Sequence, residues 1–147
     1  MVINMKKIAI GNDHAGTELK NKIISKFQDQ VEFINCGTNT NDSVDYCDYA
    51  NEVCKLILQK QVDYGILICG TGIGISIAAN RHKGIRAGLC SHSLMAKLTR
   101  QHNDANVICF GARMTGEDVI YDCIKVFLET EFEGGRHLRR IEKLDKW

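Results

Sequence analysis

The sequence predicts a doubly wound α/β fold, in which a sheet of five parallel strands is covered by helices on both faces. Short apolar runs alternate five times with segments whose apolar residues recur at three- and four-residue intervals. The central run, residues 64–69, is continuously apolar, which is typical of a parallel strand with both faces buried. A length of 147 residues suits one domain. We therefore expect one Rossmann-like, three-layer αβα domain over residues 1–147.

The apolar runs place the strands and, with them, the edge of the sheet where function is expected. The expected strands are residues 7–11, 31–36, 64–69, 85–90 and 106–110. Sheets of this kind bind ligands beyond the carboxyl ends of their strands, which we call the carboxyl edge. The segments expected there are residues 12–14, 37–38, 70–74, 91–92 and 111–113.

Apolar residues at helical spacing predict the segments that connect the strands. Thr115 is expected to cap one of these helices, and a polar helix from about Arg136 to Lys143 is expected to end the fold. Two of these segments carry the apolar residues Leu19, Ile23, Ile24 and Phe27, and Tyr49, Val53 and Ile57. A short helix is expected through residues 76–80, and the helix after Thr115 carries Val119, Ile120, Cys123, Ile124 and Phe127.

The helix after the fourth strand carries a histidine on its apolar stripe. Ser91 or Ser93 is expected to cap this helix, and Leu94, Leu98 and His102 follow one another along one stripe. His102 is therefore expected to point inward or into an interface. There it serves either as a hydrogen-bonded packing residue or as an acid–base group.

Composition excludes several classes of protein. The net charge of +1 gives no overall field that would attract nucleic acid or a membrane surface. The seven cysteines are odd in number and include no C-x-x-C pair, which favours reduced thiols over a disulfide framework. The chain has no signal-peptide pattern and no apolar run near the roughly 20 residues of a membrane helix. We expect a cytoplasmic protein with neither a nucleic-acid nor a membrane partner.

The strongest local motif joins a thiol to a glycine-rich turn. The third strand ends in Cys69, and Gly70, Gly72 and Gly74 alternate before the next helix begins. Backbone amides beside a helix N-terminus bind anions, and the same field favours a thiolate. We call residues 70–74 the glycine loop.

Three familiar phosphate-binding motifs do not match the glycine loop. A P-loop would need a lysine before Ser76, a dinucleotide fingerprint would need an acidic residue about 20 positions further on, and a cysteine phosphatase loop would need arginine at Ile75. The chemistry that remains is proton abstraction next to a carbonyl, with the amides stabilising the oxyanion. The alternative is that Cys69 is a buried structural cysteine.

Other polar residues allow both a functional and a structural interpretation. Asp13 and His14 either contact a substrate or serve as a helix cap and a solvated side chain. Arg136 and Arg140 lie four residues apart, so they share a helix face that suits a phosphate or is merely solvated. Arg113 follows the fifth strand, so topology places it at the carboxyl edge and makes it a better candidate for a phosphate contact than Arg136 or Arg140.

Seven stretches together resemble the type B ribose-5-phosphate isomerases, in the group that also holds galactose-6-phosphate isomerase subunits. They are residues 11–16, 45–46, 68–80, 91, 100–106, 111–113 and 133–137, and they span about residues 6–143. The resemblance implies interconversion of ribose 5-phosphate and ribulose 5-phosphate with no metal and no organic cofactor. It implies Cys69 as the proton-transfer base, Thr71 as its assistant, and His102 as the acid that opens the sugar ring.

The resemblance also implies the remaining contacts and the assembly. The residues implied are the amides of Gly70, Thr71, Gly72, Ile73 and Gly74 for the enediolate, Asp13, His14, Tyr46 and Asn103 for the sugar, and Arg113, Arg136 and Arg140 for the phosphate. The site would lie between the subunits of a homodimer or a dimer of dimers. His102, Asn103 and the C-terminal arginines would then come from the partner chain, on which the last helix packs.

The chain departs from the family pattern at Cys47, where proline often follows Asp-Tyr, and this affects the expected pose of Tyr46. Residues 1–5 are expected to be an N-terminal extension, with Met5 as a candidate initiator, and residues 136–147 a C-terminal helix and tail. Two alternatives stay open: the same reaction on galactose 6-phosphate or allose 6-phosphate, and a phosphosugar- or nucleotide-binding module without catalysis.

Overall fold

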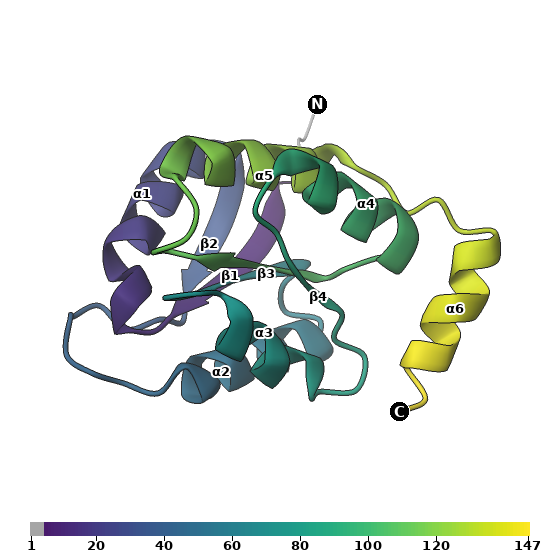
Figure 1. Cartoon of the computed structure of the whole chain (residues 1–147), viewed down its shortest axis with the longest axis horizontal. Helices are drawn as coiled ribbons and strands as arrows, with labels where there is room; N and C mark the ends of the chain where they lie inside the picture. The colour runs from purple at the N-terminus through teal and green to yellow at the C-terminus, as the bar shows by residue number, and fades with distance from the viewer. Residues whose placement is uncertain (1–4) are drawn as a thin grey trace.

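The computed structural model describes residues 5–147, in which five parallel strands form one sheet in the order β2-β1-β3-β5-β4 (Figure 1). The neighbouring strands are parallel in every pair. The strands are β1 (Lys6–Asn12), β2 (Val31–Asn35), β3 (Tyr64–Cys69), β4 (Ala87–Leu89) and β5 (Val107–Gly111). The predicted doubly wound α/β fold is therefore confirmed.

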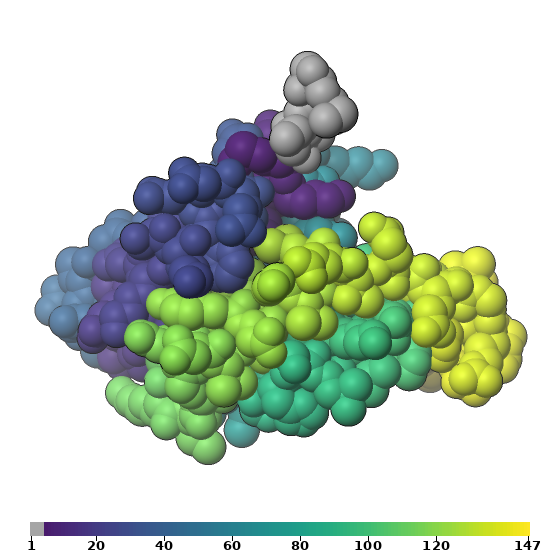
Figure 2. Space-filling view, turned by 90° about the horizontal axis from the view of Figure 1, so that it is seen from above, coloured from purple at the N-terminus to yellow at the C-terminus, as the bar shows by residue number. Residues whose placement is uncertain are grey.

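Helices cover both faces of the sheet. The helices are α1 (Thr17–Phe27), α2 (Tyr46–Leu58), α3 (Ile73–Asn80), α4 (Ser93–Asn103), α5 (Glu117–Glu129) and α6 (Arg136–Leu144), and a 3₁₀ turn, η1 (His14–Gly16), precedes α1. One face is covered by α1, α4 and α5, which lie side by side in Figure 2, and the other face by α2 and α3. The last helix, α6, projects beyond the end of α4 at one end of the molecule.

The alternation of side chains along the central strand divides the core into two layers. Ile66 and Ile68 point toward α1, α4 and α5, whereas Leu67 and Cys69 point toward α2 and α3. All four side chains are buried, as the continuous apolar run predicts. Cys69 therefore enters the layer from which α3 and the glycine loop arise.

The predicted caps of two helices are each wrong by one residue. The first turn of α4 is closed by the carbonyl of His92, which accepts from the amides of Met95 and Ala96, so neither Ser91 nor Ser93 is the cap. The cap of α5 is Gly116, whose carbonyl accepts from Ile120, and not Thr115. Neither cap residue forms a side-chain hydrogen bond to the first turn of its helix.

The buried face of α4 also differs from the predicted stripe. Ala96 and Arg100 face the core, while Leu94 is 55% exposed. The Arg100 guanidinium is buried because it bonds to Asp104 and to the Ala105 carbonyl. The helix is therefore rotated away from the orientation that apolar periodicity suggested.

The C-terminal helix agrees with the predicted polar helix. Helix α6 covers Arg136–Leu144. Arg86 Nη1 donates to both carboxylate oxygens of Asp145 at 2.9 Å, which anchors the end of this helix. Residues 1–4 of the expected extension lie outside the described residues. Within residues 5–147, no helix combines the length and the apolarity needed to cross a membrane.

Candidate active site

Three strand ends meet at the carboxyl edge and bring the predicted site segments together. The amide of Asp13 donates to the Ile68 carbonyl at 3.1 Å, and the amide of Ala112 donates to the Cys69 carbonyl at 2.9 Å. The segments after β1, β3 and β5 are thus tied directly to one another. Asp13, Cys69 and Arg113 consequently belong to one edge of the sheet, as strand order predicts.

The glycine loop folds back onto the Cys69 sulfur. Cys69 Sγ accepts a hydrogen bond from the amide of Gly72 at 3.2 Å, and its side chain is 4% exposed. Gly72 adopts φ +78°, and a Cβ there would lie 2.5 Å from Leu89 Cδ1. Only glycine permits this turn, which places α3 immediately after the thiol.

The hydrogen bond distinguishes Cys69 from other buried cysteines. The thiols of Cys54 and Cys90 donate to carbonyl oxygens. Burial raises the pKa of Cys54 and Cys90 to about 12, so both stay protonated. The Cys69 sulfur instead accepts a hydrogen bond from a backbone N–H.

Two side chains frame the glycine loop. The Tyr46 ring lies against Gly74, where an added Cβ would be 2.6 Å from Tyr46 Cζ. This contact exists although Cys47, in the first turn of α2, replaces the proline common in the family. The Arg113 guanidinium lies over Gly70, with Nη1 3.2 Å from the position of a Cβ there. The two ends of the glycine loop are therefore flanked by a phenol and a cation.

Asp13 and His14 are held in place after β1. Asp13 accepts from the amide of Ala15 at 3.0 Å, so the capping interpretation is confirmed. His14 Nδ1 accepts from the amide of Val44 at 3.2 Å and is half-buried, so the interpretation as a solvated side chain is wrong.

Buried polar groups fix the loop that leads to Tyr46. Lys20 is fully buried; its ammonium donates to the Thr38 carbonyl and, at 2.6 Å, to Asn39 Oδ1, and burial lowers its pKa. Asn12 Nδ2 donates to the same Thr38 carbonyl at 3.2 Å. These bonds join the loop after β2 to β1 and α1.

The other predicted site residues lie at the amino ends of the strands, away from the carboxyl edge. This second group comprises His102, Asn103, Arg136 and Arg140. Helix α4 runs antiparallel to β5, so His102 and Asn103 lie near the amino end of that strand. Cys69 pairs with Gly111 at its carboxyl end. The five residues of β5 correspond to about 16 Å. Arg136 and Arg140 are exposed on α6, beside α4. One chain does not join these residues to Cys69.

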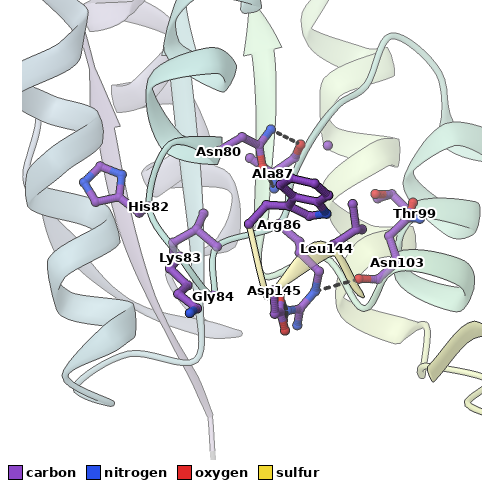
Figure 3. Close-up of a pocket in the computed structure, with 13 residues that line it drawn as sticks. Asn80, His82, Lys83, Gly84, Arg86, Ala87, Thr99, Asn103, Leu144 and Asp145 are labelled. Atoms are coloured by element: carbon purple, nitrogen blue, oxygen red, sulfur yellow. Dashed lines mark hydrogen bonds and ion pairs between the residues drawn. The ribbon is translucent and has the colours of Figure 1, made fainter. Parts of the chain in front are cut away.

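A cavity of about 520 Å³ opens near the second group, between β4, the end of α4 and the end of α6 (Figure 3). Asn103 borders it, and its carbonyl accepts from Arg86 Nε at 2.8 Å. Because Asp145 neutralises the Arg86 guanidinium, that cation is not available to an anionic ligand.

Sequence reasoning missed one partner of His102. The rings of His102 and His137 stack with centroids 4.4 Å apart and an interplanar angle of 14°. Glu133 Oε2 lies 3.4 Å from His137 Nε2. The four-residue spacing of Glu133 and His137 was the available signal, but it gives no indication of the contact with α4.

The family pattern described as ribose/galactose isomerase matches residues 8–144. The chain belongs to this family. It is 47% identical to ribose-5-phosphate isomerase B of Escherichia coli over 141 residues, covering 95% of each chain. It is equally 47% identical to a putative sugar phosphate isomerase of Rickettsia conorii, covering 93% of this chain and 96% of that one.

Solved structures of ribose/galactose isomerase family members have the same fold. A ribose 5-phosphate isomerase from Thermotoga maritima matches with a TM-score of 0.96 and 47% identity, covering 98% of this chain and 100% of that one. Ribose-5-phosphate isomerase B from Clostridium thermocellum matches with a TM-score of 0.94 and 45% identity, covering 95% of each chain. The resemblance that the sequence motifs indicated is confirmed.

Proposed function

We propose that this chain interconverts D-ribose 5-phosphate and D-ribulose 5-phosphate. The observation that supports this most directly is the Cys69 sulfur, which accepts the Gly72 amide at the head of the glycine loop. A cysteine sulfur beside backbone donors suits proton transfer next to a carbonyl. Relatives that bear the name ribose-5-phosphate isomerase B and align over nearly the whole chain support the five-carbon substrate.

In the proposed reaction, the Cys69 thiolate removes the proton from carbon 2 of the open-chain aldose. The electron pair moves into a carbon–carbon double bond, and the carbonyl oxygen becomes an enediolate oxygen. Amides of Gly70–Gly74 other than that of Gly72, which holds the Cys69 sulfur, donate to this oxygen, and Thr71 assists the proton transfers between the oxygens. The thiol returns its proton to carbon 1, which gives the ketose and restores the thiolate.

His102 is proposed as the acid that protonates the ring oxygen when the furanose opens. Asp13, His14, Tyr46 and Asn103 would line the sugar. Arg113, Arg136 and Arg140 would bind the phosphate, since guanidinium groups form paired hydrogen bonds to phosphate oxygens.

The site is proposed to form between two copies of the chain, in a homodimer or a dimer of dimers. His102 lies one strand length from Cys69, so a twofold pairing would bring each His102 to the partner's thiol. The helices beside edge strand β4 leave apolar side chains exposed: Ile73, Ile77, Leu94 and Met95. Such exposure is typical of an interface, and α6 would pack on the partner.

We place the protein in the cytoplasm, because its seven cysteines are free thiols and five of them are buried. The net charge of +1 favours neither nucleic acid nor membrane as a partner. A small sugar phosphate is then the expected ligand.

A coupled assay with ribose 5-phosphate, galactose 6-phosphate and allose 6-phosphate side by side tests the proposal. We expect turnover of the five-carbon substrate by the purified chain alone, with little turnover of the others. Preference for a six-carbon substrate would show that the chain is a galactose-6-phosphate or allose-6-phosphate isomerase instead. Tight binding of all three without isomerisation would indicate a binding module.

A further inference from the structure

Three metal-ligating side chains meet at the junction of α4 and α6. His102 comes from the last turn of α4, Glu133 from the segment before α6, and His137 from the first turn of α6. One potential ligand atom from each lies within 4.8 Å of the other two. His137 Nε2 and Glu133 Oε2 are 3.4 Å apart. We call this group the His102–Glu133–His137 cluster.

The backbone holds the cluster together independently of any ligand. The amide of Glu133 donates to the Gln101 carbonyl at 3.1 Å, which holds the backbone of Glu133 beside the last turn of α4. Gly134 and Gly135 then adopt φ +68° and +57°, and the chain reverses so that the His137 amide donates to the Gly134 carbonyl at 3.1 Å. These constraints predispose the side chains to converge.

We propose that the His102–Glu133–His137 cluster binds a divalent transition-metal cation, Zn²⁺ being the best match, and that this cation inhibits the isomerase. Two imidazoles and one carboxylate, with a fourth position open to water, are a ligand set that zinc prefers. Tetrahedral bonds of about 2.0–2.1 Å place neighbouring ligand atoms about 3.3 Å apart, close to the observed 3.4 Å between His137 and Glu133. His102 would complete the set by turning its ring out of the stack.

The surroundings indicate reversible occupancy rather than a permanent structural ion. Glu133 is half-exposed, so a cation reaches the cluster from solvent, whereas His137 is 6% exposed and well fixed. Arg136, Arg139 and Arg140 are exposed on the same helix and repel a cation. Salt screens exposed charges of this kind, so they weaken the site without abolishing it.

Inhibition follows from the role proposed above for His102, and the inference rests on that role. A zinc ion occupies the His102 nitrogen lone pair, which removes the group that exchanges a proton with the ring oxygen. Ribulose 5-phosphate cannot close into a furanose, because its C5 oxygen carries the phosphate. Zinc should therefore slow ribose 5-phosphate conversion more than the initial rate from ribulose 5-phosphate, whose aldose product can leave in open form.

The experiment titrates wild-type enzyme with ZnCl₂ in both directions and records the absorption spectrum with CoCl₂ as a probe. Zinc should lower the rate from ribose 5-phosphate by up to about 10²–10⁴-fold, the typical contribution of an acid catalyst. The rate from ribulose 5-phosphate should fall much less, and EDTA should restore activity. The Co²⁺ spectrum should lack sulfur-to-cobalt charge transfer. Glu133→Gln should lose Co²⁺ binding and zinc inhibition, whereas Glu131→Gln, an exposed carboxylate in the same segment, should keep both.

Several outcomes would overturn the inference. Equal inhibition of wild type and Glu133→Gln, or equal inhibition in both directions, would contradict a metal that acts through His102. A thiolate band with Co²⁺ would place the metal on Cys69 instead. Cobalt binding that Glu133→Gln abolishes, without zinc inhibition, would refute the inhibitory effect. If no isomerase activity exists at all, the proposed function fails, and the Co²⁺ spectra of wild type and Glu133→Gln still decide whether the metal site exists.

Discussion

The amide of Gly72 donates to the sulfur of Cys69, three residues earlier, at 3.2 Å. This short loop makes the sulfur an acceptor, while the buried thiols of Cys54 and Cys90 donate to carbonyl oxygens. The contact exists only because Gly72 adopts φ +78°. The chemistry proposed for Cys69 thus depends on a neighbouring backbone conformation as much as on the thiol.

Replacing Cys69 with alanine should lower kcat/KM for ribose 5-phosphate by about 10²–10⁴-fold, the typical contribution of a general base. The fold should persist, because the hydrogen bond that ties Cys69 to Ala112 uses the backbone carbonyl and not the sulfur. Steady-state kinetics and far-UV circular dichroism check both statements. Cys54→Ala is the control, because it removes a buried thiol that donates to a carbonyl. Near-wild-type turnover by Cys69→Ala would remove Cys69 from the mechanism.

Gly72→Ala should destabilise the protein and disturb the site together. A Cβ at position 72 would lie 2.5 Å from Leu89 Cδ1 and 2.8 Å from the Phe110 carbonyl carbon, in a backbone conformation that alanine resists. Strain and overpacking of this kind each cost about 1–3 kcal/mol. Urea unfolding measures the loss. Gly116→Ala meets no neighbour within 4 Å and should lose less, only the about 0.5–1 kcal/mol that separates alanine from glycine at a helix N-cap. Equal effects at both positions would contradict the strain argument.

Arg136→Ala should raise KM for ribose 5-phosphate by about 10–100-fold and change kcat less, if the guanidinium contributes a charged hydrogen bond of about 1.5–3 kcal/mol to the phosphate. Arg139→Ala, also exposed on α6, is the matched control for charge and should behave like wild type. An unchanged KM in Arg136→Ala would exclude Arg136 from the phosphate site.

Two inactive variants should complement each other if the site is shared between subunits. Cys69→Ala and His102→Asn would each lack one half of every site. After co-refolding in equal amounts, half of the dimers are mixed, and each mixed dimer regains one complete site. Mixing should therefore restore about one quarter of wild-type activity. No recovery, with mixed dimers verified by mass spectrometry, would indicate a site within one chain.

The free energy of unfolding should fall at alkaline pH. Burial raises the pKa of Cys54 and Cys90 from 9.0 to about 12, so between these values the unfolded chain releases protons that the folded chain keeps. Their contribution is fully present below pH 9.0 and is lost as the pH rises toward about 12. The slope is about 1.4 kcal/mol per pH unit for each thiol. Urea titrations at several pH values check it: Cys54→Ala should flatten the slope, and exposed Cys47→Ala should not.

The first half of the candidate site was predictable because strand ends are predictable. The apolar run before Cys69 and the polar residues after β1 and β5 fix Asp13, Cys69 and Arg113 at one edge through topology alone. The glycine spacing indicated a turn toward the thiol. The sequence could not reveal which amide reaches the sulfur, since that depends on the φ of Gly72.

Errors arose where a tertiary contact overrode a local pattern. Arg100 occupies the core face of α4 because it lies 5.2 Å from the Tyr64 ring centroid and bonds to Asp104, so periodicity of apolar residues misplaced that face. The helix caps were missed because residues without a capping side-chain bond, His92 and Gly116, occupy those positions. The stacking of His102 on His137 joins residues 35 positions apart, and only the docking of α6 produces it.

The direction of α4 has a consequence for enzyme concentration. Since the helix carries His102 to the edge opposite Cys69, the proposed assembly gives an isolated chain two half-sites and no complete one. Specific activity should then decline on dilution below the dissociation constant of the dimer, and substrate that bridges two chains should oppose that decline. Specific activity would therefore measure the fraction of chains that are in dimers.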